Sequence, residues 1–328
     1  MISNKTILIF GGSGSLGNQI IKRYINNNIL INYSRDECKH WEMKLNYHNN
    51  PNLKFAIGDI RDKMRVKHII RQEKPNIIII AAAMKHIDQC EFATHECIET
   101  NLSGIKNILD SIDEESNEFK TFLETICFIS TDKACSPVNV YGMAKAISEC
   151  LMVEKSFFNK NYKYVTVRYG NVLNSRGSII PIMHDMGNDS FIKEFKLTHL
   201  DMTRFVMTLD ESVNLIEHAI LHGESGDIVV PKLISMKVKD LIEIFCEIYN
   251  KSYSVTGLRP GEKMLESLIN ETQSMRIIQD DKGYYFIKPT YLGKIFNNDP
   301  KDFNSTINPL SKEELKEYLI GLDLIKKY

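Results

Sequence analysis

The feature that most constrains the fold of this chain is a glycine-rich loop close to its N-terminus. The loop reads Gly11-Gly-Ser-Gly-Ser-Leu-Gly17 and therefore has a GxxGxxG spacing. It lies between an apolar run expected to form a strand, Thr6–Phe10, and an expected helix, Asn18–Asn26. Glycines let the backbone turn tightly and approach a pyrophosphate, which then sits at the positive N-terminus of the helix. The loop predicts a dinucleotide site whose expected contacts are Gly11, Ser13, Gly14, Ser15, Leu16 and Gly17.

Two other interpretations of this loop were considered. Gly12 and Gly17 have the spacing of a P-loop, which requires a lysine and then Ser or Thr as the next residues. Here Asn18 and Gln19 follow, so the P-loop is excluded. A strand–helix turn that binds no ligand stays open as the alternative.

Short apolar runs alternate with helical patterns through the first half of the chain. The further strands are expected at Ile29–Tyr33, Leu53–Ile57, Asn76–Ala83, Thr125–Ile129 and Tyr164–Arg168. The further helices are expected at Lys63–Gln72, Ala93–Ile112 and Tyr141–Phe158. Continuous apolar strands that alternate with helices predict an α/β fold with a Rossmann-like, doubly wound parallel sheet covered on both faces.

After Arg168 loops dominate, although helices are still expected at Thr208–Leu221 and Val238–Tyr249, and Ser311 and Glu314 have the spacing of a capping box. We expect residues 1–170, with about 205–230 returning, to form the dinucleotide-binding domain. Residues 171–204 and 231–328 are expected to form a smaller α/β substrate-binding lobe.

The bulk composition excludes several classes of protein. The net charge of -1 argues against a general grip on nucleic acid, which needs a basic face. The seven cysteines contain no CxxC pair, so a zinc site is not expected. We expect them to be reduced thiols of a cytoplasmic protein. The longest apolar run, Ile77–Met84, is far shorter than the roughly twenty residues of a membrane span, and no membrane partner is expected.

The residues after the second expected strand bear on the choice of dinucleotide. An acid there binds a ribose hydroxyl, whereas an arginine suits a 2′-phosphate. Ser34 and Arg35 come before Asp36, so we predict NADP, with NAD less favoured; a solvated Arg35 is the alternative. Further expected cofactor contacts follow the third and fourth strands and are Asp59, Ile60, Ala81, Ala82 and Ala83, although alanines packed under a helix give the same pattern.

Tyr141 and Lys145 are four residues apart and share one face of an expected helix. The lysine, which is also an expected cofactor contact, and a positive nicotinamide are expected to lower the pKa of the phenol. The phenolate can then take a proton from an alcohol. An ordinary surface Tyr–Lys pair is the alternative.

An acid and a base, Asp132 and Lys133, follow the expected strand Thr125–Ile129 directly after Ser130 and Thr131. Adjacent residues of a strand point to opposite faces, so both can reach one pocket only if the strand has already ended. The alternative is that Lys133 points to solvent and Asp132 caps a local turn.

Together these motifs resemble the extended short-chain dehydrogenase/reductase family over almost the whole chain. The motifs that carry the resemblance are GGSGSLG (11–17), GDIRD (58–62), AAAMKH (81–86), STDK (130–133), YGMAK (141–145), RYGNVLNSRGSIIP (168–181), DMTRF (201–205) and RPGEK (259–263). Within that family, Asp-Lys ahead of YxxxK resembles the inverting UDP-N-acetylglucosamine 4,6-dehydratases of polysaccharide biosynthesis. Retaining hexose 4,6-dehydratases have Asp-Glu at this place, and 4-epimerases lack the acid–base pair.

The resemblance implies a hydro-lyase that uses NADP as an internal redox cofactor. Tyr141 would deprotonate the C4 hydroxyl, Lys133 would remove H5 and Asp132 would protonate the departing C6 hydroxyl, with Thr131 beside them. The implied substrate contacts are Lys85, Asn171, Asn174, Arg176, Arg204, Arg259 and Glu262. Family members are commonly dimers or hexamers. The alternatives are a nucleotide-sugar 4-epimerase or reductase, and a catalytically silent NADP-binding regulator.

Overall fold

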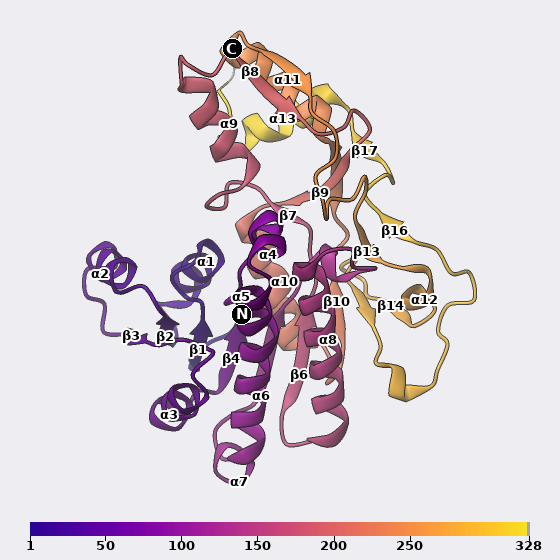
Figure 1. Ribbon diagram of the computed structural model, residues 1–328. Helices are drawn as coiled ribbons and strands as arrows, with labels where there is room; N and C mark the ends of the chain where they lie inside the picture. Colours follow the sequence, from indigo (N-terminus) through magenta and orange to yellow (C-terminus); the bar gives the residue numbers. More distant parts are fainter. Residues whose placement is uncertain (327–328) are drawn as a thin grey trace.

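A nine-stranded sheet forms the centre of the larger lobe in the computed structural model, which describes residues 1–326 (Figure 1). The strand order across this sheet is β14 (Ile277–Gln279), β15 (Tyr285–Ile287), β10 (Ile228–Val230), β6 (Lys163–Val167), β5 (Thr125–Ile129), β4 (Ile77–Ile80), β1 (Thr6–Phe10), β2 (Ile29–Ser34) and β3 (Leu53–Ile57). Seven neighbouring strands are parallel, and beside them β15 pairs antiparallel with β10 and β14 pairs antiparallel with β15.

The apolar runs of the sequence are continuous because both faces of this sheet are covered. In β1, Ile7 and Ile9 join one apolar cluster, and Leu8 and Phe10 join the other. Successive strand residues point to opposite faces, so a strand between two helical layers has no polar side. The helices on the first face are α1 (Ser15–Tyr24), α2 (Glu37–Asn46) and α10 (Leu209–His222), and those on the second are α3 (Lys63–Glu73), α6 (Gly104–Glu114) and α8 (Val140–Phe158).

The helix expected at 93–112 is interrupted. It begins as α5 (Thr94–Ile98), continues as a turn of π-helix, η1 (Glu99–Ser103), and resumes as α6. Two short helices flank it, α4 (Ile87–Phe92) and α7 (Ser116–Phe119). The π-helical turn widens the helix beside the ends of the central strands, where functional groups are commonly found.

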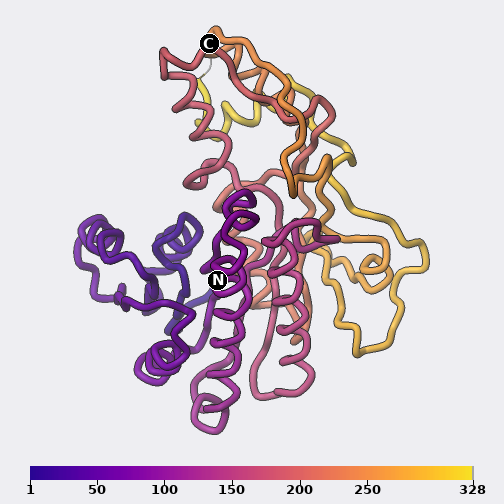
Figure 2. The backbone as a smooth tube through the Cα atoms, in the orientation of Figure 1, coloured from indigo at the N-terminus to yellow at the C-terminus, as the bar shows by residue number. Residues whose placement is uncertain are grey.

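The smaller lobe lies over the carboxyl ends of the parallel strands, and Figure 2 shows that it is built from the middle and the last part of the chain. Its four-stranded sheet is ordered β17 (Pro309–Leu310), β11 (Ile234–Lys237), β9 (Thr203–Met207) and β7 (Asn171–Val172). Two further pairs are β8 (Glu194–Leu197) with β12 (Ser252–Val255), and β13 (Ser267–Ile269) with β16 (Phe303–Asn304). Its helical elements are α9 (Ile179–Asn188), α11 (Val238–Tyr249), α12 (Glu271–Ser274), η3 (Thr290–Leu292) and α13 (Lys312–Gly321).

The chain passes between the lobes at other places than the sequence analysis expected. Residues 277–287, assigned to the smaller lobe, form β14 and β15 and extend the central sheet. Residues 205–207, expected to return to the larger lobe, lie in β9 of the smaller sheet. The return itself occurs with α10, whose predicted helix is confirmed and begins at a Thr208–Glu211 capping box. The capping box at Ser311 and Glu314 is also confirmed.

Within residues 1–326, no helix is long and apolar enough to cross a membrane. The same residues contain no group of three or more His, Cys, Asp or Glu side chains that could hold a metal ion.

A fully buried ion pair joins the two lobes under the carboxyl end of the sheet. Arg168 follows β6, and its guanidinium donates to both carboxylate oxygens of Glu149 in α8, at 3.0 and 2.5 Å. Its remaining nitrogen donates to the carbonyl oxygen of Leu268 and to Gln273 Oε1. Ser130 Oγ donates to the same carboxylate at 2.6 Å. One arginine therefore connects α8, β13 and α12 with the end of β5.

We expect Glu149→Ala to lower the free energy of unfolding by about 3–5 kcal/mol, because it leaves the Arg168 charge buried without a partner. The double variant Glu149→Leu/Arg168→Met removes both charges and is expected to lose less. Denaturant unfolding followed by circular dichroism measures both variants. An equal loss in the single and double variants would contradict this explanation.

Candidate functional site

A cavity of about 270 Å³ opens at the carboxyl ends of β1, β2 and β4. Ten of the residues predicted to contact the cofactor line it together: Gly11, Ser13, Gly14, Ser34, Arg35, Asp59, Ile60, Ala81, Ala82 and Ala83. Ser15, Leu16, Gly17 and Lys145 are not among its lining residues in the described part of the chain. The cavity lies where the strand order reverses between β1 and β4, which is the place where open α/β sheets bind their ligands.

The glycine loop packs so tightly that side chains are excluded from it. Gly11 has a φ of +91°, and a Cβ there would meet the backbone nitrogen of Ala82 at 2.7 Å. A Cβ on Gly17 would meet Gly12 Cα at 2.5 Å. The expected strand Asn76–Ala83 ends earlier, at Ile80, so the three alanines form the wall of the cavity instead of extending β4. Bare backbone and small side chains leave room for a flat, phosphate-bearing dinucleotide, so these residues fit that group.

Charged side chains that line this cavity come from the residues directly after β2, from α2 and from the loop after β3. Arg35 is 58% exposed, and its Nη1 lies 3.5 Å from Asp59 Oδ2. Partial burial would raise the pKa of Asp59, but hydrogen bonds from Arg61 lower it overall. Lys39 also lines the cavity, and its Nζ lies 2.7 Å from Asp36 Oδ2. The sequence analysis did not single out Lys39, although it stands one helical turn after Arg35.

Tyr141 and Lys145 lie on the first turns of α8 and are both buried. Asn139 caps this helix by accepting from the Gly142 backbone N–H at 2.7 Å, so the expected shared helix face is present. Lys145 Nζ donates to the Ile129 carbonyl oxygen at 2.8 Å and lies 4.6 Å from the centre of the Phe128 ring. The alternative of a surface Tyr–Lys pair is therefore wrong.

The electrostatics of this pair differ from the expectation. Burial lowers the pKa of Lys145 to about 8. Burial and the nearby Asp132 raise the pKa of Tyr141 above its ordinary value, against a smaller lowering by Thr131. The lowering of the phenol pKa by Lys145 together with a bound nicotinamide stays a prediction, because in the protein by itself desolvation of the phenolate dominates.

The strand before Asp132 and Lys133 ends at Ile129, and both residues form a 3₁₀ turn, η2 (Asp132–Ala134). Because the strand has ended, the two side chains are not forced to opposite faces, and Lys133 Nζ donates to Asp132 Oδ1 at 3.0 Å. Thr131 Oγ1 donates to the same oxygen at 2.8 Å. Asp132 is fully buried, and its Oδ2 is left without a hydrogen-bond partner in the described structure. The solvent-exposed alternative for Lys133 is wrong.

Two buried groups beside this turn were missed by the sequence analysis. Glu266 is 2% exposed, and its Oε1 lies 3.7 Å from Lys133 Nζ. Asn101 lies in the π-helical turn, and its side chain bonds both the N–H and the C=O of Met84, each at 2.8 Å. Glu266 follows three residues after the RPGEK motif, but only the fold brings it to Lys133. The polar Asn101 within an apolar helical pattern is a signal that could have been noticed.

The predicted substrate residues fall into two groups. Lys85 Nζ donates to the Arg176 carbonyl oxygen at 2.5 Å, and the Arg176 backbone N–H donates to Ser15 Oγ at 3.0 Å. Burial, and then Arg176, lower the pKa of Lys85. Arg204 is buried next to the acid–base turn and donates to the Thr203 carbonyl oxygen. Asn171, in β7, has a buried Oδ1 without a partner in the described structure.

The other predicted substrate residues are not brought to these groups. Asn174 and Arg259 are exposed, and the Arg259 backbone N–H donates to Glu262 Oε2 at 3.2 Å. Asn139 Nδ2 donates to the Gly261 carbonyl oxygen at 2.8 Å, which ties this loop to the start of α8. In residues 1–326 Arg204 donates to backbone carbonyl oxygens and not to a carboxylate within ion-pair distance.

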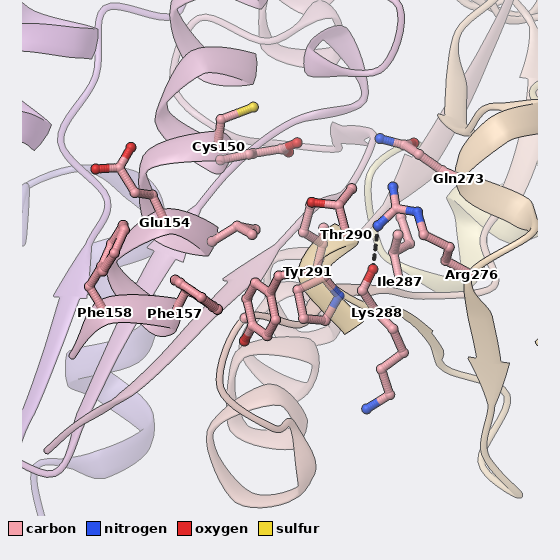
Figure 3. A pocket seen from close by; sticks show the side chains of 15 residues that line it. Cys150, Glu154, Phe157, Phe158, Gln273, Arg276, Ile287, Lys288, Thr290 and Tyr291 are labelled. Carbon is pink, nitrogen blue, oxygen red and sulfur yellow. Dashed lines mark hydrogen bonds between the residues drawn. The ribbon is translucent and has the colours of Figure 1, made fainter. Parts of the chain in front are cut away.

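A second cavity, of about 370 Å³, lies behind α8 and is separate from the first. Figure 3 shows Phe157, Phe158 and Tyr291 along its apolar side and the Arg276 guanidinium bonded to the Lys288 carbonyl oxygen on the other. None of the sequence-predicted site residues is among its described lining residues. It shares Glu149 and Gln273 with the connections around Arg168 described above.

We expect Gly142→Ala to disturb the acid–base turn, because a Cβ on Gly142 would meet the Lys133 carbonyl oxygen at 2.2 Å. Overpacking of this kind costs about 1–3 kcal/mol, so the midpoint of thermal unfolding should fall. Gly321→Ala is the matched control, because a Cβ there meets nothing within 4 Å. If both variants unfold at the wild-type temperature, the close approach of α8 to this turn does not constrain it.

Comparisons with known proteins agree with this geometry. Residues 7–288 match the family described as "Polysaccharide biosynthesis protein". The chain is 36% identical over 321 residues to a UDP-N-acetylglucosamine 4,6-dehydratase (inverting) of Campylobacter jejuni subsp. jejuni serotype O:2, covering 96% of this chain and 91% of the relative. It is 34% identical over 348 residues to a UDP-glucose 4-epimerase of Rickettsia rickettsii, covering 100% of this chain and 98% of the relative.

Solved structures show the same fold. Pen from Bacillus thuringiensis superposes with a TM-score of 0.90 at 27% identity and 99% coverage of both chains. A UDP-glucose 4-epimerase of Thermotoga maritima superposes with a TM-score of 0.65 at 18% identity, covering 78% of this chain and 87% of that one, and it shows the fold alone. The predicted resemblance and fold class are confirmed, and the chain belongs to the polysaccharide biosynthesis protein family.

Proposed function

We propose that this protein is an NADP-dependent UDP-N-acetylglucosamine 4,6-dehydratase that inverts C5. Its product would be UDP-2-acetamido-2,6-dideoxy-L-arabino-hex-4-ulose, which serves the synthesis of 6-deoxy-amino sugars and glycans. The observation that carries the proposal is the Asp132–Lys133 pair on a turn beside buried Tyr141 and Lys145. A plain alcohol dehydrogenase does not need a second acid and base. Loss of water followed by reprotonation of the sugar does need them.

The larger lobe would hold the dinucleotide along the glycine loop and the three alanines that follow β4. Ser34 and Arg35 would lie at the 2′-phosphate of the dinucleotide. When bound, it supplies the ability to take a hydride from C4 of the sugar and to return it at C6. Arg35 carries the preference for NADP over NAD, because a guanidinium bonds phosphate oxygens in a bidentate way.

The protein's own groups would move the protons. Tyr141 takes the proton of the C4 hydroxyl, and the fixed positive charge of the nicotinamide would offset the burial that raises the phenol pKa. Lys145 has a pKa of about 8, so it can both hold a charge near the phenolate and exchange a proton near neutral pH. Asp132 protonates the departing C6 hydroxyl, and Lys133 removes H5.

The smaller lobe would bind the nucleotide part of the substrate. Arg204 stands beside the acid–base turn, and Lys85 and Arg176 lie between this turn and the glycine loop. Three cationic side chains suit a diphosphate. Asn171 would use its unpartnered Oδ1. Asn174, in the loop after β7, and Arg259 and Glu262, in the loop before β13, would contact the uridine.

We further propose a cytoplasmic homo-oligomer, a dimer or a hexamer. The seven cysteines are all free thiols, which suits a reducing compartment. Exposed apolar side chains on α4 and α8, namely Phe92, Met143 and Ile147, would be covered by a second copy.

Relatives that carry the printed name UDP-glucose 4-epimerase support a second candidate, a nucleotide-sugar 4-epimerase on the same fold. The two candidates differ in one observable, because epimerisation leaves the mass of the UDP-sugar unchanged and dehydration removes one water.

Incubation with UDP-N-acetylglucosamine alone is expected to give a product that lacks one water, with deuterium at C5 when the reaction runs in D₂O. Mass spectrometry and proton NMR measure both. Tyr141→Phe should slow the loss of water by about 10²–10⁴-fold, because the phenolic proton acceptor is gone. An unchanged mass would overturn the proposal in favour of the epimerase, and loss of water with an unchanged configuration at C5 would overturn the inversion.

Arg35→Gln is expected to weaken NADPH binding about tenfold or more and to leave NADH binding unchanged, since charged hydrogen bonds contribute about 1.5–3 kcal/mol. Titration calorimetry on the purified protein measures both. Lys44→Gln, which removes one positive charge from the exposed far end of α2, is the matched control. Equal loss for both nucleotides would show that Arg35 does not read the 2′-phosphate.

A further inference from the structure

Glu266 is a buried carboxyl group that the reaction described above does not use. It lies just before β13, and its backbone is fixed on both sides by Ser305, whose Oγ accepts from the Glu266 N–H at 3.0 Å and whose N–H donates to the Glu266 C=O at 2.8 Å. The side chain is 2% exposed overall, so the carboxyl group has almost no contact with solvent. A carboxylate in such a place is costly unless it has a partner.

Its two oxygens face two different lysines. Oε1 lies 3.7 Å from Lys133 Nζ, and Oε2 lies 3.5 Å from Lys263 Nζ. Both distances exceed that of a good charge-assisted hydrogen bond. Lys263 Nζ donates instead to the Cys135 carbonyl oxygen at 2.8 Å, and Oε2 has no hydrogen-bond partner in the described structure. Glu266 is therefore held close to two cations while one of its oxygens stays free to accept a proton.

The charged groups that face Glu266 come from every element packed around it: Asp132 and Lys133 from η2, Lys263 from the loop before β13, and Arg204 from β9. Burial raises the pKa of Glu266, and the surrounding cations lower it by less. Burial alone would lower the pKa of Lys133, but Asp132 and Glu266 raise it overall. Lys133 accordingly carries its proton at neutral pH, while the carboxyl group next to it is unusually ready to take one.

This arrangement matters for a lysine that must act as a base. An ammonium group has no lone pair, so Lys133 must lose a proton before it can remove H5. Asp132 is unsuited to receive that proton if it is to deliver one to the departing C6 hydroxyl. Among the described residues, Glu266 is the other carboxyl group in contact with Lys133.

We infer that Glu266 is a positioning residue that holds Lys133 between two carboxyl groups and accepts the proton of Lys133, so that Lys133 becomes a free amine. In this step one Lys133 N–H bond breaks and one Glu266 O–H bond forms, so that an ion pair becomes a neutral acid beside a neutral amine. No external acid or oxidant takes part. The inference rests on the proposed function only for the identity of the proton that Lys133 then removes.

Glu266→Gln keeps the shape of the side chain but cannot take a proton or carry charge. In the free protein we expect the pKa of the Lys133 amine to fall, as measured by NMR titration of ¹³C-labelled lysine side chains with the signal assigned by Lys133→Arg. Glu271→Gln removes a charge from an exposed position of α12 and is the matched control, with an unchanged Lys133 titration. An identical Lys133 titration in wild type and Glu266→Gln overturns the inference, whatever the enzyme does.

The second readout is the pH profile of hydrogen exchange at C5 with UDP-N-acetylglucosamine in D₂O. Glu266→Gln should make the exchange rate depend steeply on pH, about tenfold or more below the wild-type rate on the acidic side and rising until the lowered pKa of Lys133 is passed, whereas the wild-type rate changes less over the same range. Glu266→Asp should restore part of the rate on the acidic side. An equal loss at every pH would mean a purely structural role and would also overturn the inference.

The two hypotheses fail separately. A wild-type protein that removes no water from UDP-N-acetylglucosamine refutes the proposed function, while the titration of Lys133 still decides on Glu266. A wild-type dehydratase whose Glu266→Gln variant keeps the same rate and the same pH profile refutes the inference alone. Binding of NADPH, measured for each variant, checks that the larger lobe remains folded.

Discussion

The bidentate contact between Arg168 and Glu149 is the interaction on which the rest of the site depends. It is fully withdrawn from water, and a buried pair of this kind does not by itself add stability, because removing two charges from water offsets most of their attraction. What it supplies is a fixed geometry. The Glu149 carboxylate also accepts a hydrogen bond from Ser130, which leads into the acid–base turn. The Arg168 guanidinium also donates to the Leu268 carbonyl oxygen and to Gln273, in the segment that follows Glu266. The acid–base turn and Glu266 are thus both positioned by the same buried ion pair.

Burial opposes the charged form of Tyr141, Lys145 and Lys133 alike, but the charges around these groups differ. It raises the pKa of the Tyr141 phenol and lowers the pKa of Lys145 to about 8, so the phenol keeps its proton while the amine still carries charge at neutral pH. At Lys133 the acidic neighbours outweigh burial and hold the amine in its charged form. In the proposed reaction, Tyr141 would therefore be activated by the cofactor, whereas Lys133 would already be charged beforehand.

The fold could be predicted from the sequence where a structural feature depends on neighbouring residues. The glycine loop, the apolar runs and the caps at Thr208 and Ser311 are consecutive residues whose geometry follows from their own chemistry. The π-helical turn was missed because a wider helical turn leaves no residue pattern of its own, and β14 and β15 were misplaced because strands of three residues carry almost no periodicity. Glu266 and Lys39 could not be assigned, since only tertiary contacts bring them to Lys133 and to the cavity. The burial that raises the pKa of Tyr141 in the protein by itself could not be foreseen, because burial cannot be read from a spacing.

The contact between Arg176 and Ser15 has a consequence for timing. It places the loop after β7 directly on the glycine loop, with Lys85 on its other side. A dinucleotide lying along that glycine loop would have to part this contact in order to leave. For an enzyme that ends every cycle with its cofactor in the starting oxidation state, such confinement carries no penalty. An enzyme that exchanges its cofactor at each turnover would have to break these two hydrogen bonds every time, whereas the proposed internal redox cycle, which keeps its cofactor, would not.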